Sequence, residues 1–240
     1  MTMDIKKVEK ISLCKICNSE ASLYGVIDFN ELHGRHGLKS KLSGQPIYYH
    51  RCEHCGLIYT NAFDHWNEDD FSTYIYNDEY IHIDPDFPEL RPQQNARFLI
   101  ENFSDIKSYH MLDFGCGNNK LVDLLKEKGV DATGWDPFYQ NDSMPQERFE
   151  FIVSFEVMEH TPDPIKTVSL IDNLLNSNNG KFFFSTLNND SRLHLKMDDW
   201  YILPRGGHVS YYSTKSLNIL FRKFNMEVHH ICDGLHLAFK

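Results

Sequence analysis

Apolar runs of strand length alternate with segments of helical periodicity through the second half of this chain. The strand-like runs occupy residues 110–114, 131–135, 149–154 and 180–185, and the helical patterns occupy residues 118–128 and 163–175. Such periodicities distinguish strands from amphipathic helices. Their alternation predicts a mostly parallel sheet with helices on both faces.

The flanking sequence predicts further elements. A helical pattern at residues 93–104 leads into the sheet, whereas the proline-containing segment before Gln93 predicts no regular structure. Residues 214–225 predict an amphipathic helix with Thr214 as its N-cap. Residues 226–239 then predict a hairpin, turning at Asp-Gly. The expected fold class is a doubly wound, Rossmann-like α/β sheet that ends in an antiparallel hairpin.

The most informative stretch is Met-Leu-Asp-Phe-Gly-Cys-Gly-Asn-Asn at residues 111–119. A strand ends near Asp113, a turn contains Gly115 and Gly117, and a helix follows. Glycines let the backbone approach a ligand closely, and the free N–H groups of a helix start supply donors. Asp136 ends the next strand, where a carboxylate can accept both hydroxyls of a ribose. Glycine turns also occur without ligands, so this turn alone leaves the function open.

A second motif, Ser-Phe-Glu-Val-Met-Glu-His-Thr-Pro-Asp-Pro, occupies residues 154–164. With the glycine turn and the acidic residue in the same order and spacing, the chain resembles class I S-adenosylmethionine-dependent methyltransferases. The resemblance is greatest to the small-molecule group whose fourth strand ends in a Glu-Val-Leu-Glu-His-like run. An NAD-binding Rossmann domain is the alternative for the turn. It usually has a third glycine and does not account for the Glu-x-x-Glu-His run.

The resemblance implies S-adenosyl-L-methionine as cofactor and a set of residues that contact it. These are Asp113, Gly115, Cys116, Gly117, Asp136, Pro137, Phe138, Ser154, Phe155 and Glu156. Only 12 residues separate Asp136 from Phe149, where the family normally has a helix and a third strand. This short region keeps open a catalytically inactive relative of such enzymes.

Four of the six cysteines form two C-x-x-C pairs, Cys14 with Cys17 and Cys52 with Cys55. In a reducing compartment, two such pairs favour a tetrahedral zinc site with four thiolate ligands, with disulfides as the alternative. The surrounding segment has few large aliphatic residues, and metal binding can supply the folding free energy that a small core lacks. We therefore expect a structural Zn²⁺.

This region resembles the N-terminal zinc-binding part of bacterial deoxysugar C-methyltransferases. The likeness includes Val26-Ile27-Asp28-Phe29 between the cysteine pairs and Pro-Ile-Tyr-Tyr before the second pair. Those enzymes continue with a further C-terminal domain that has no counterpart here, which disfavours C-methylation. The expected organisation is a zinc-binding module at 1–65, an aromatic-rich lid and linker helix at 66–105, and a methyltransferase domain at 106–240.

Composition limits the partners. A formal net charge of −10 disfavours a nucleic-acid substrate, because phosphate binding needs a basic face. The N-terminus lacks the apolar region of a signal peptide, and no apolar run is long enough to span a bilayer. We expect a cytoplasmic protein without a membrane span that acts on a small molecule.

Two histidines are candidate general bases, since an imidazole with a pKa near neutrality suits proton removal from a hydroxyl. His160 follows the fourth strand at the carboxyl edge of the sheet, and a structural role is its alternative. His208 follows Gly206-Gly207 in a loop expected to move over the acceptor. Other aromatic residues are expected to cover the sulfonium or border the acceptor, with packing as the alternative. They are Tyr80 on the cofactor side and Tyr74, Tyr76, Trp200 and Tyr201 on the acceptor side.

The resemblance thus implies methyl transfer from S-adenosyl-L-methionine to a small-molecule acceptor. The likeness to sugar enzymes points to a hydroxyl of a sugar, a nucleotide-sugar or a surface-polysaccharide precursor. C- or N-methylation of a small metabolite is one alternative. A catalytically inactive zinc-ribbon interaction protein with a methyltransferase-like fold is another.

Overall fold

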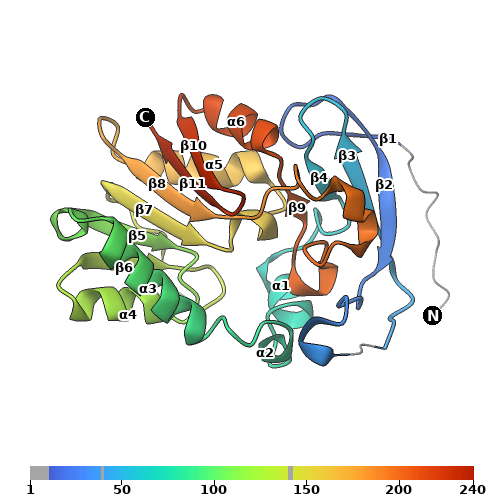
Figure 1. Cartoon of the computed structure of the whole chain (residues 1–240), viewed down its shortest axis with the longest axis horizontal. Helices are drawn as coiled ribbons and strands as arrows, with labels where there is room; N and C mark the ends of the chain where they lie inside the picture. The colour runs from blue at the N-terminus through green and yellow to red at the C-terminus, as the bar shows by residue number, and fades with distance from the viewer. Residues whose placement is uncertain (1–10, 39–40, 140–142) are drawn as a thin grey trace.

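The computed structural model describes residues 11–38, 41–139 and 143–240, which fold around two β-sheets (Figure 1). The larger sheet has the strand order β10-β11-β8-β7-β5-β6. Its strands are β5 (His110–Phe114), β6 (Asp131–Trp135), β7 (Phe151–Phe155), β8 (Lys181–Ser185), β10 (Glu227–Cys232) and β11 (Leu235–Phe239). β6, β5, β7 and β8 are parallel, and β11 is antiparallel to both β8 and β10. The predicted Rossmann-like sheet with its terminal hairpin is confirmed.

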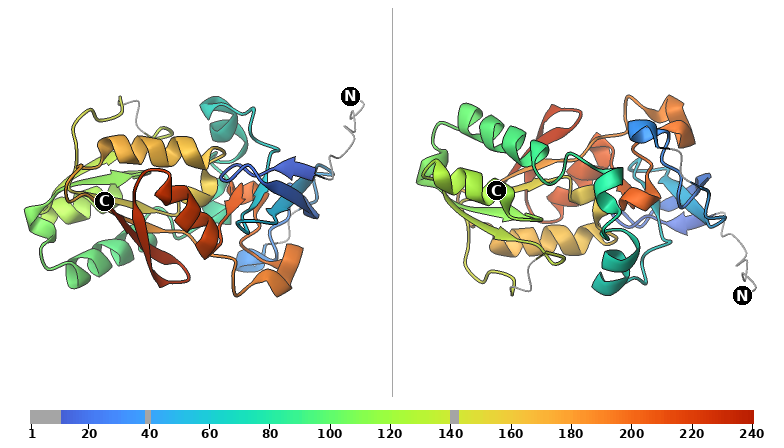
Figure 2. Two further views of the ribbon diagram at one scale, coloured as in Figure 1. Left: turned by 90° about the horizontal axis from the view of Figure 1, so that it is seen from above. Right: turned by 90° about the horizontal axis from the view of Figure 1, so that it is seen from below.

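Helices cover both faces of this sheet. They are α3 (Leu90–Asn102), α4 (Lys120–Glu127), α5 (Pro164–Leu174) and α6 (Thr214–Arg222). Figure 2 shows α3 and α4 on the side of the sheet opposite α5. The α6 N-cap is Ser213 rather than the predicted Thr214, because Ser213 and Ser216 cap each other's backbone N–H groups.

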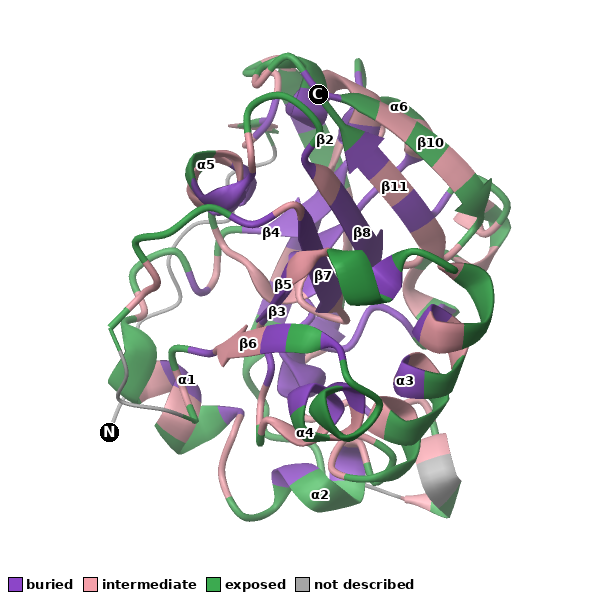
Figure 3. Ribbon diagram, turned by 90° about the vertical axis from the view of Figure 1, so that its left-hand side faces the viewer, coloured by how far each residue is buried: buried purple, intermediate pink, exposed green. Residues whose placement is uncertain are grey.

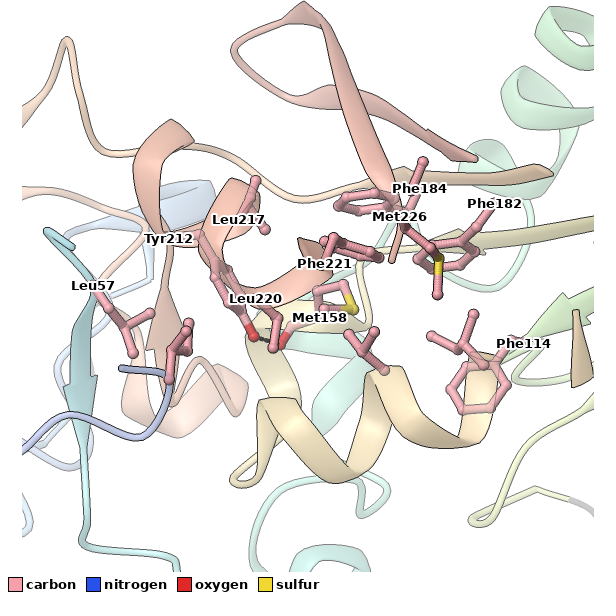
Figure 4. Packing of buried hydrophobic residues seen from close by; sticks show 14 of the residues in the cluster. Leu57, Phe114, Met158, Phe182, Phe184, Tyr212, Leu217, Leu220, Phe221 and Met226 are labelled. Carbon is pink, nitrogen blue, oxygen red and sulfur yellow. Dashed lines mark hydrogen bonds between the residues drawn. The ribbon is translucent and has the colours of Figure 1, made fainter. Parts of the chain in front are cut away.

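The core is divided by the alternation of side chains along each strand. Phe182 and Phe184 of β8 pack with residues of α5 and α6, whereas Phe183 between them packs with residues of α3 and α4. All three are fully buried, as expected of a parallel strand covered on both faces. Figure 4 shows Phe182 and Phe184 beside Phe221 of α6, and Figure 3 shows buried residues concentrated in the central strands.

The second sheet is antiparallel, with the order β1-β2-β3-β4-β9. Its strands are β1 (Ile11–Leu13), β2 (Glu20–Asp28), β3 (Pro46–Cys52), β4 (Ile58–Thr60) and β9 (Ser210–Tyr211). β9 comes from late in the chain, and Tyr211 pairs with Ile58. The N-terminal sheet is therefore completed by a segment that lies beyond β8 in sequence.

The segment before Gln93 contains regular structure, so the prediction that it has none is wrong. It holds α1 (Glu68–Tyr74) and α2 (Tyr80–Ile83), and α3 begins at Leu90. The physical reason for α1 is a capping box. The Asn67 side chain accepts from the Asp70 amide at 3.0 Å, and the Asp70 carboxylate accepts from the Asn67 amide at 3.1 Å.

Short 3₁₀ helices connect the larger elements. They are η1 (Arg35–Gly37), η2 (Ile106–Ser108), η3 (Met158–His160), η4 (Leu193–Asp198) and η5 (Pro204–Gly206). The larger sheet ends at β6, and no strand occurs at the described positions 137–139 and 143–148, as their shortness predicted. No helix in the described part of the chain is long and apolar enough to cross a membrane.

Candidate functional site

The glycine turn after β5 adopts a backbone that only glycine fits without strain. Gly115 has φ +85°, and a Cβ there would lie 2.4 Å from Cγ2 of Val157. Gly134 of β6 is equally confined, because a Cβ there would lie 2.1 Å from Oδ1 of Asn119. The turn is thus held closely between β6 and the segment that follows β7.

Asp136, directly after β6, holds the turn in place. One carboxylate oxygen accepts from the Gly117 amide at 3.0 Å, and the other accepts from the Phe138 amide at 2.8 Å. Burial raises the pKa of Asp136. Burial, together with the Asp136 charge, raises the pKa of Asp113 to about 8. Two buried carboxyl groups therefore lie at the carboxyl edge of the sheet, where open α/β folds bind ligands.

A cleft of about 870 Å³ opens at this edge. Ten of the predicted site residues line it: Asp113, Gly115, Cys116, Pro137, Phe138, Phe155, Glu156, Tyr76, Tyr80 and His160. Gly117, Asp136 and Ser154 are not among the lining residues. Ser154 is fully buried, and its hydroxyl donates to the Phe114 carbonyl at 2.8 Å, so it ties β7 to β5.

Aromatic rings form one wall of the cleft. Tyr76 lies 5.2 Å from Tyr80 and 4.8 Å from Phe138 between ring centroids. Trp66 and Phe87 line the same cleft. The segment containing α1 and α2, predicted as a lid, therefore contributes five of the ten Phe, Tyr and Trp residues that line the cleft.

Sequence reasoning missed Arg91 and Asn95 of α3, which also line the cleft. Arg91 makes a bidentate ion pair with Asp84, at 2.7 and 2.8 Å. The missed signal was Pro92. Proline is favoured in the first turn of a helix, so Pro92 indicated that α3 begins before it and includes Arg91.

Three predicted acceptor residues lie elsewhere. Tyr74 is 53% exposed and packs on Trp66, and Trp200 is 40% exposed, with Arg35 4.9 Å from its ring centroid. Tyr201 is 1% exposed, and its hydroxyl donates to Oε1 of Glu159 at 2.6 Å. None of the three lines the cleft in this structure.

The candidate bases form a compact cluster with Glu159, which was not among the predicted site residues. Ligand atoms of Glu159, His160 and His208 all lie within 4.8 Å of one another. The two imidazole rings meet edge to face at 4.8 Å between centroids. His160 lines the cleft, and the Tyr76 hydroxyl lies 3.1 Å from its Nδ1. His208 lies behind it, 7% exposed.

The expectation that these imidazoles titrate near neutrality is wrong. Burial lowers the pKa of His160 to about 3, and nearby Arg91 adds to the effect. Burial also lowers the pKa of His208 to about 3, with a further contribution from His160. Both rings are therefore neutral at pH 7, because removal from water disfavours the charged form.

The four predicted zinc ligands converge at one point. Sγ of Cys14 lies 3.5 Å from that of Cys55, and Sγ of Cys17 lies 3.5 Å from that of Cys52. All four are free thiols. A tetrahedral zinc with Zn–S bonds of about 2.3 Å separates its sulfur atoms by about 3.8 Å, whereas a disulfide needs about 2.05 Å. The donor set and spacing fit zinc.

Backbone amides support these sulfurs. The Ile16 amide donates to Sγ of Cys14 at 3.4 Å, and the Cys55 amide donates to Sγ of Cys52 at 3.3 Å. The second knuckle also touches the region around β9, because the Ser213 hydroxyl donates to the Cys55 carbonyl at 2.5 Å. The cysteine cluster thus anchors the smaller sheet to the N-terminus of α6.

A family model described as a methyltransferase domain matches residues 87–231, more than half of the chain. The chain therefore belongs to the methyltransferase-domain family, which confirms the predicted class of enzyme.

Proteins of similar sequence or structure are also named as methyltransferases. Ubiquinone biosynthesis O-methyltransferase of Coxiella burnetii is 29% identical over 138 residues, covering 45% of this chain and 58% of that protein. The same-named protein of Paracidovorax citrulli is 27% identical over 155 residues, covering 50% and 65%. The chain thus spans well under two thirds of the first of these. Magnesium protoporphyrin IX methyltransferase from Synechocystis aligns with a TM-score of 0.48 at 11% identity, covering 74% of this chain and 93% of that one.

Proposed function

We propose that this protein transfers the methyl group of S-adenosyl-L-methionine to a hydroxyl of a small-molecule acceptor. The observation that carries the proposal is the glycine turn held by Asp136 at the rim of the cleft. Gly115 lines the cleft and Gly117 is fixed by the carboxylate. Membership of the methyltransferase-domain family supports the cofactor.

The cofactor would lie along the carboxyl edge of the larger sheet. The adenosine would sit near Pro137 and Phe138, with Asp136 toward the ribose. The methionine part would pass Gly115 toward Glu156, whose carboxylate accepts from the Ser185 hydroxyl at 2.7 Å. The remaining proposed contacts are Asp113, Cys116, Gly117, Ser154 and Phe155, with Tyr80 against the sulfonium.

The acceptor would face the aromatic wall. Rings such as Tyr76, Phe138 and Trp66 favour an acceptor that presents a flat, largely apolar ring with a hydroxyl. Acidic side chains outnumber basic ones among the lining residues, with Glu68 and Asp69 among them. This charge disfavours the diphosphate of a nucleotide-sugar. The O-methyltransferase names of the relatives also favour oxygen over carbon or nitrogen.

The sugar and surface-polysaccharide acceptors expected from the sequence are therefore not carried into the proposal. Trp200 and Tyr74 are not assigned acceptor contacts either, since both lie outside the lining. Tyr76 keeps its proposed role at the acceptor. Tyr201 is assigned an indirect role through its hydrogen bond to Glu159.

We assign the four cysteines a structural Zn²⁺. Their role would be to hold the smaller sheet together and to fix it against Ser213, since the thiolate-to-zinc bonds replace core packing in a small module. Nothing in the proposed methyl transfer requires this ion at the cleft.

Titration calorimetry of the full chain with S-adenosyl-L-methionine tests the proposal first. Binding, followed by S-adenosylhomocysteine release in the presence of a catechol, would support methyl transfer to a ring hydroxyl. Release with a nucleotide-sugar but not with catechols would support the sugar acceptor instead. Failure to bind the cofactor at millimolar concentration would favour the inactive zinc-ribbon interaction protein, because a scaffold has no need of it.

A further inference from the structure

The cluster of Glu159, His160 and His208 contains an unsatisfied carboxylate oxygen. Glu159 is fully buried, and its Oε1 accepts from Tyr201 while its Oε2 has no hydrogen-bond partner among the described residues. A buried carboxylate oxygen without a partner is costly, because no water replaces the lost hydrogen bond. This oxygen belongs to a carboxylate that lies within 4.8 Å of two imidazoles.

The orientation of His208 leaves a nitrogen lone pair for a ligand. Its Nδ1 lies 2.7 Å from the Tyr201 carbonyl oxygen. A carbonyl oxygen only accepts, so Nδ1 carries the hydrogen and Nε2 is a bare acceptor. A ring fixed in this way, by a backbone carbonyl behind it, is the usual arrangement of a histidine that ligates a metal.

Gly207 allows the close approach that this cluster requires. A Cβ at this position would lie 2.8 Å from Nδ1 of His160, and the residue has φ +88°. The backbone also ties the cluster together, because the Val209 amide donates to the Glu159 carbonyl at 2.8 Å. Because Gly207 has no side chain, the loop that contains it packs directly against His160. His160 and His208 are therefore held next to each other, although they are distant in sequence.

The geometry points to a divalent-cation site formed by Glu159, His160 and His208, with Glu156 beside it. Resting on the proposed function, the cation would bind the acceptor hydroxyl and promote its methylation. The donor set of two imidazoles and a carboxylate suits Mn²⁺, Fe²⁺ or Zn²⁺ better than Ca²⁺, which takes oxygen ligands. The hydrogen bond from Nδ1 of His208 to the Tyr201 carbonyl leaves the Nε2 lone pair of that ring available to a cation.

The charge around the cluster agrees with a cation. The carboxyl groups of Glu156 and Glu159 adjoin each other. Two adjacent carboxylates in a dry site favour either a shared proton or a bound positive ion. Glu156 has φ +55° and lines the cleft, so a second carboxyl group lies beside the cluster on the cleft side.

The site is open on the side where the acceptor would bind. Glu156 and His160 line the cleft, whereas Glu159 and His208 lie behind them. A cation there would bind an acceptor hydroxyl oxygen and lower its pKa, so that the proton passes to solvent. An oxygen lone pair then forms the O–CH3 bond. The S–CH3 bond breaks, and its electron pair goes to sulfur, leaving the neutral thioether S-adenosylhomocysteine.

This site explains the chemistry better than a histidine base. A general base must reach the proton it removes, but His208 does not line the cleft, and Nδ1 of His160 faces the Tyr76 hydroxyl at 3.1 Å. To bind a cation, an imidazole needs only a free nitrogen lone pair. A bound cation also favours hydroxyl acceptors, above all those with a second oxygen on the adjacent carbon, since two oxygens can bind the same ion.

The test measures cation binding without cofactor or acceptor. Zinc-loaded full-length protein is titrated with Mn²⁺ by calorimetry, and the bound ion is counted by electron paramagnetic resonance. Thiolates prefer zinc to Mn²⁺, so the cysteine cluster stays occupied. One Mn²⁺ per chain is expected beyond the zinc. Glu159→Gln and His160→Gln should each weaken Mn²⁺ binding by about 100-fold or more, since loss of a supporting partner alone costs 10–100-fold.

His236→Gln is the matched control, because His236 is a fully buried imidazole that bonds the Thr186 carbonyl at 2.9 Å and lies outside the cluster. This variant should bind Mn²⁺ as the wild type does. If Glu159→Gln fails to fold, His160→Gln still decides, since His160 is only partly buried.

The inference is overturned if folded wild-type protein takes up no Mn²⁺, Mg²⁺ or additional Zn²⁺. It is also overturned if the His160 variant binds Mn²⁺ normally. A proton shared by Glu156 and Glu159 would then be the explanation of the buried oxygen. Methyl transfer without cation binding would leave the proposed function standing, whereas cation binding without S-adenosyl-L-methionine binding would remove the proposed function alone.

Discussion

The carboxylate of Asp136 accepts the backbone amide of Gly117 at 3.0 Å, linking the end of one strand to the turn that follows its neighbour. The second oxygen accepts from the Phe138 amide. Asp136 therefore orders the turn, and our proposal also assigns it the ribose of the cofactor. A buried carboxylate that fixes two amides is pre-organised, so a ligand that uses it loses little additional entropy on binding.

Replacing Asp136 by alanine should weaken S-adenosyl-L-methionine binding by about 2–3 kcal/mol. The loss comprises charge-assisted hydrogen bonds to the ribose and the order of the glycine turn. Titration calorimetry measures it. Asp123→Ala, on the exposed face of α4, is the control and should bind normally. Unchanged affinity in the Asp136 variant would place the cofactor elsewhere.

Alanine substitutions at two glycines with nearly equal φ distinguish the cost of a left-handed backbone from the cost of a steric clash. Gly115 and Gly129 have φ +85° and +81°, but only Gly115 has a neighbour within reach of a Cβ, Val157 at 2.4 Å. Gly129→Ala should lower the free energy of unfolding by about 1–2 kcal/mol, the cost of a left-handed backbone. Cofactor affinity should not change.

Gly115→Ala should lower the free energy of unfolding by more than this and weaken cofactor binding by at least about tenfold, because Val157 or the turn must move. Urea unfolding and calorimetry measure the two effects. If Gly115→Ala and Gly129→Ala behave alike, the contact with Val157 does not shape the site.

Cys52→Ser should reduce the zinc content below one equivalent and destabilise the protein. A ligand present at a thousandfold excess over its Kd contributes about 4 kcal/mol, which for a chain of this size corresponds to a fall in Tm of about 8–16 °C. Metal analysis and thermal unfolding measure both quantities. Cys232→Ser, at an exposed cysteine in β10, should change neither. A stable, zinc-free wild type would contradict the assignment.

Local sequence signals were sufficient where structure depends on local chemistry. The Gly115 turn, the alternation of β5 to β8 and the two cysteine pairs all follow from residue type and spacing. The pairing of Ile58 with Tyr211 could not be predicted, because short strands distant in sequence carry no signal of their partner. For the same reason the sequence could not predict that His208 is buried against His160. The lowered pKa of both rings was therefore not predictable either.

The segment before α3 was mispredicted for a different reason. Its prolines at 85, 88 and 92 suggested irregular structure, yet Pro92 lies in the first turn of α3, where its missing N–H costs nothing. The capping box of Asn67 and Asp70 was visible in the sequence, and reading it would have found α1. Glu159 was present in the quoted motif, but only the fold shows its unpartnered oxygen.

Asp113 should make the stability of the protein depend on pH. Its pKa is raised to about 8 in the folded state by burial and by Asp136, against about 3.9 in an unfolded chain. Between these values the folded protein holds a proton that the unfolded chain has lost. The contribution of Asp113 to the free energy of unfolding is therefore fully present below about pH 4, and it is lost as the pH rises toward 8.

Urea unfolding of the wild type and of Asp113→Asn at pH 5 and pH 8 tests this sign. From pH 5 to pH 8 the wild type should lose about 3 kcal/mol more than the variant, because an amide keeps its neutral form at both values. Comparing the two proteins cancels the titration of histidines and other groups. Asp123→Asn, at an exposed carboxylate, should follow the wild type. Equal losses in all three proteins would mean that Asp113 is ionised in its buried position, stabilised by a positive group that reaches it through the cleft.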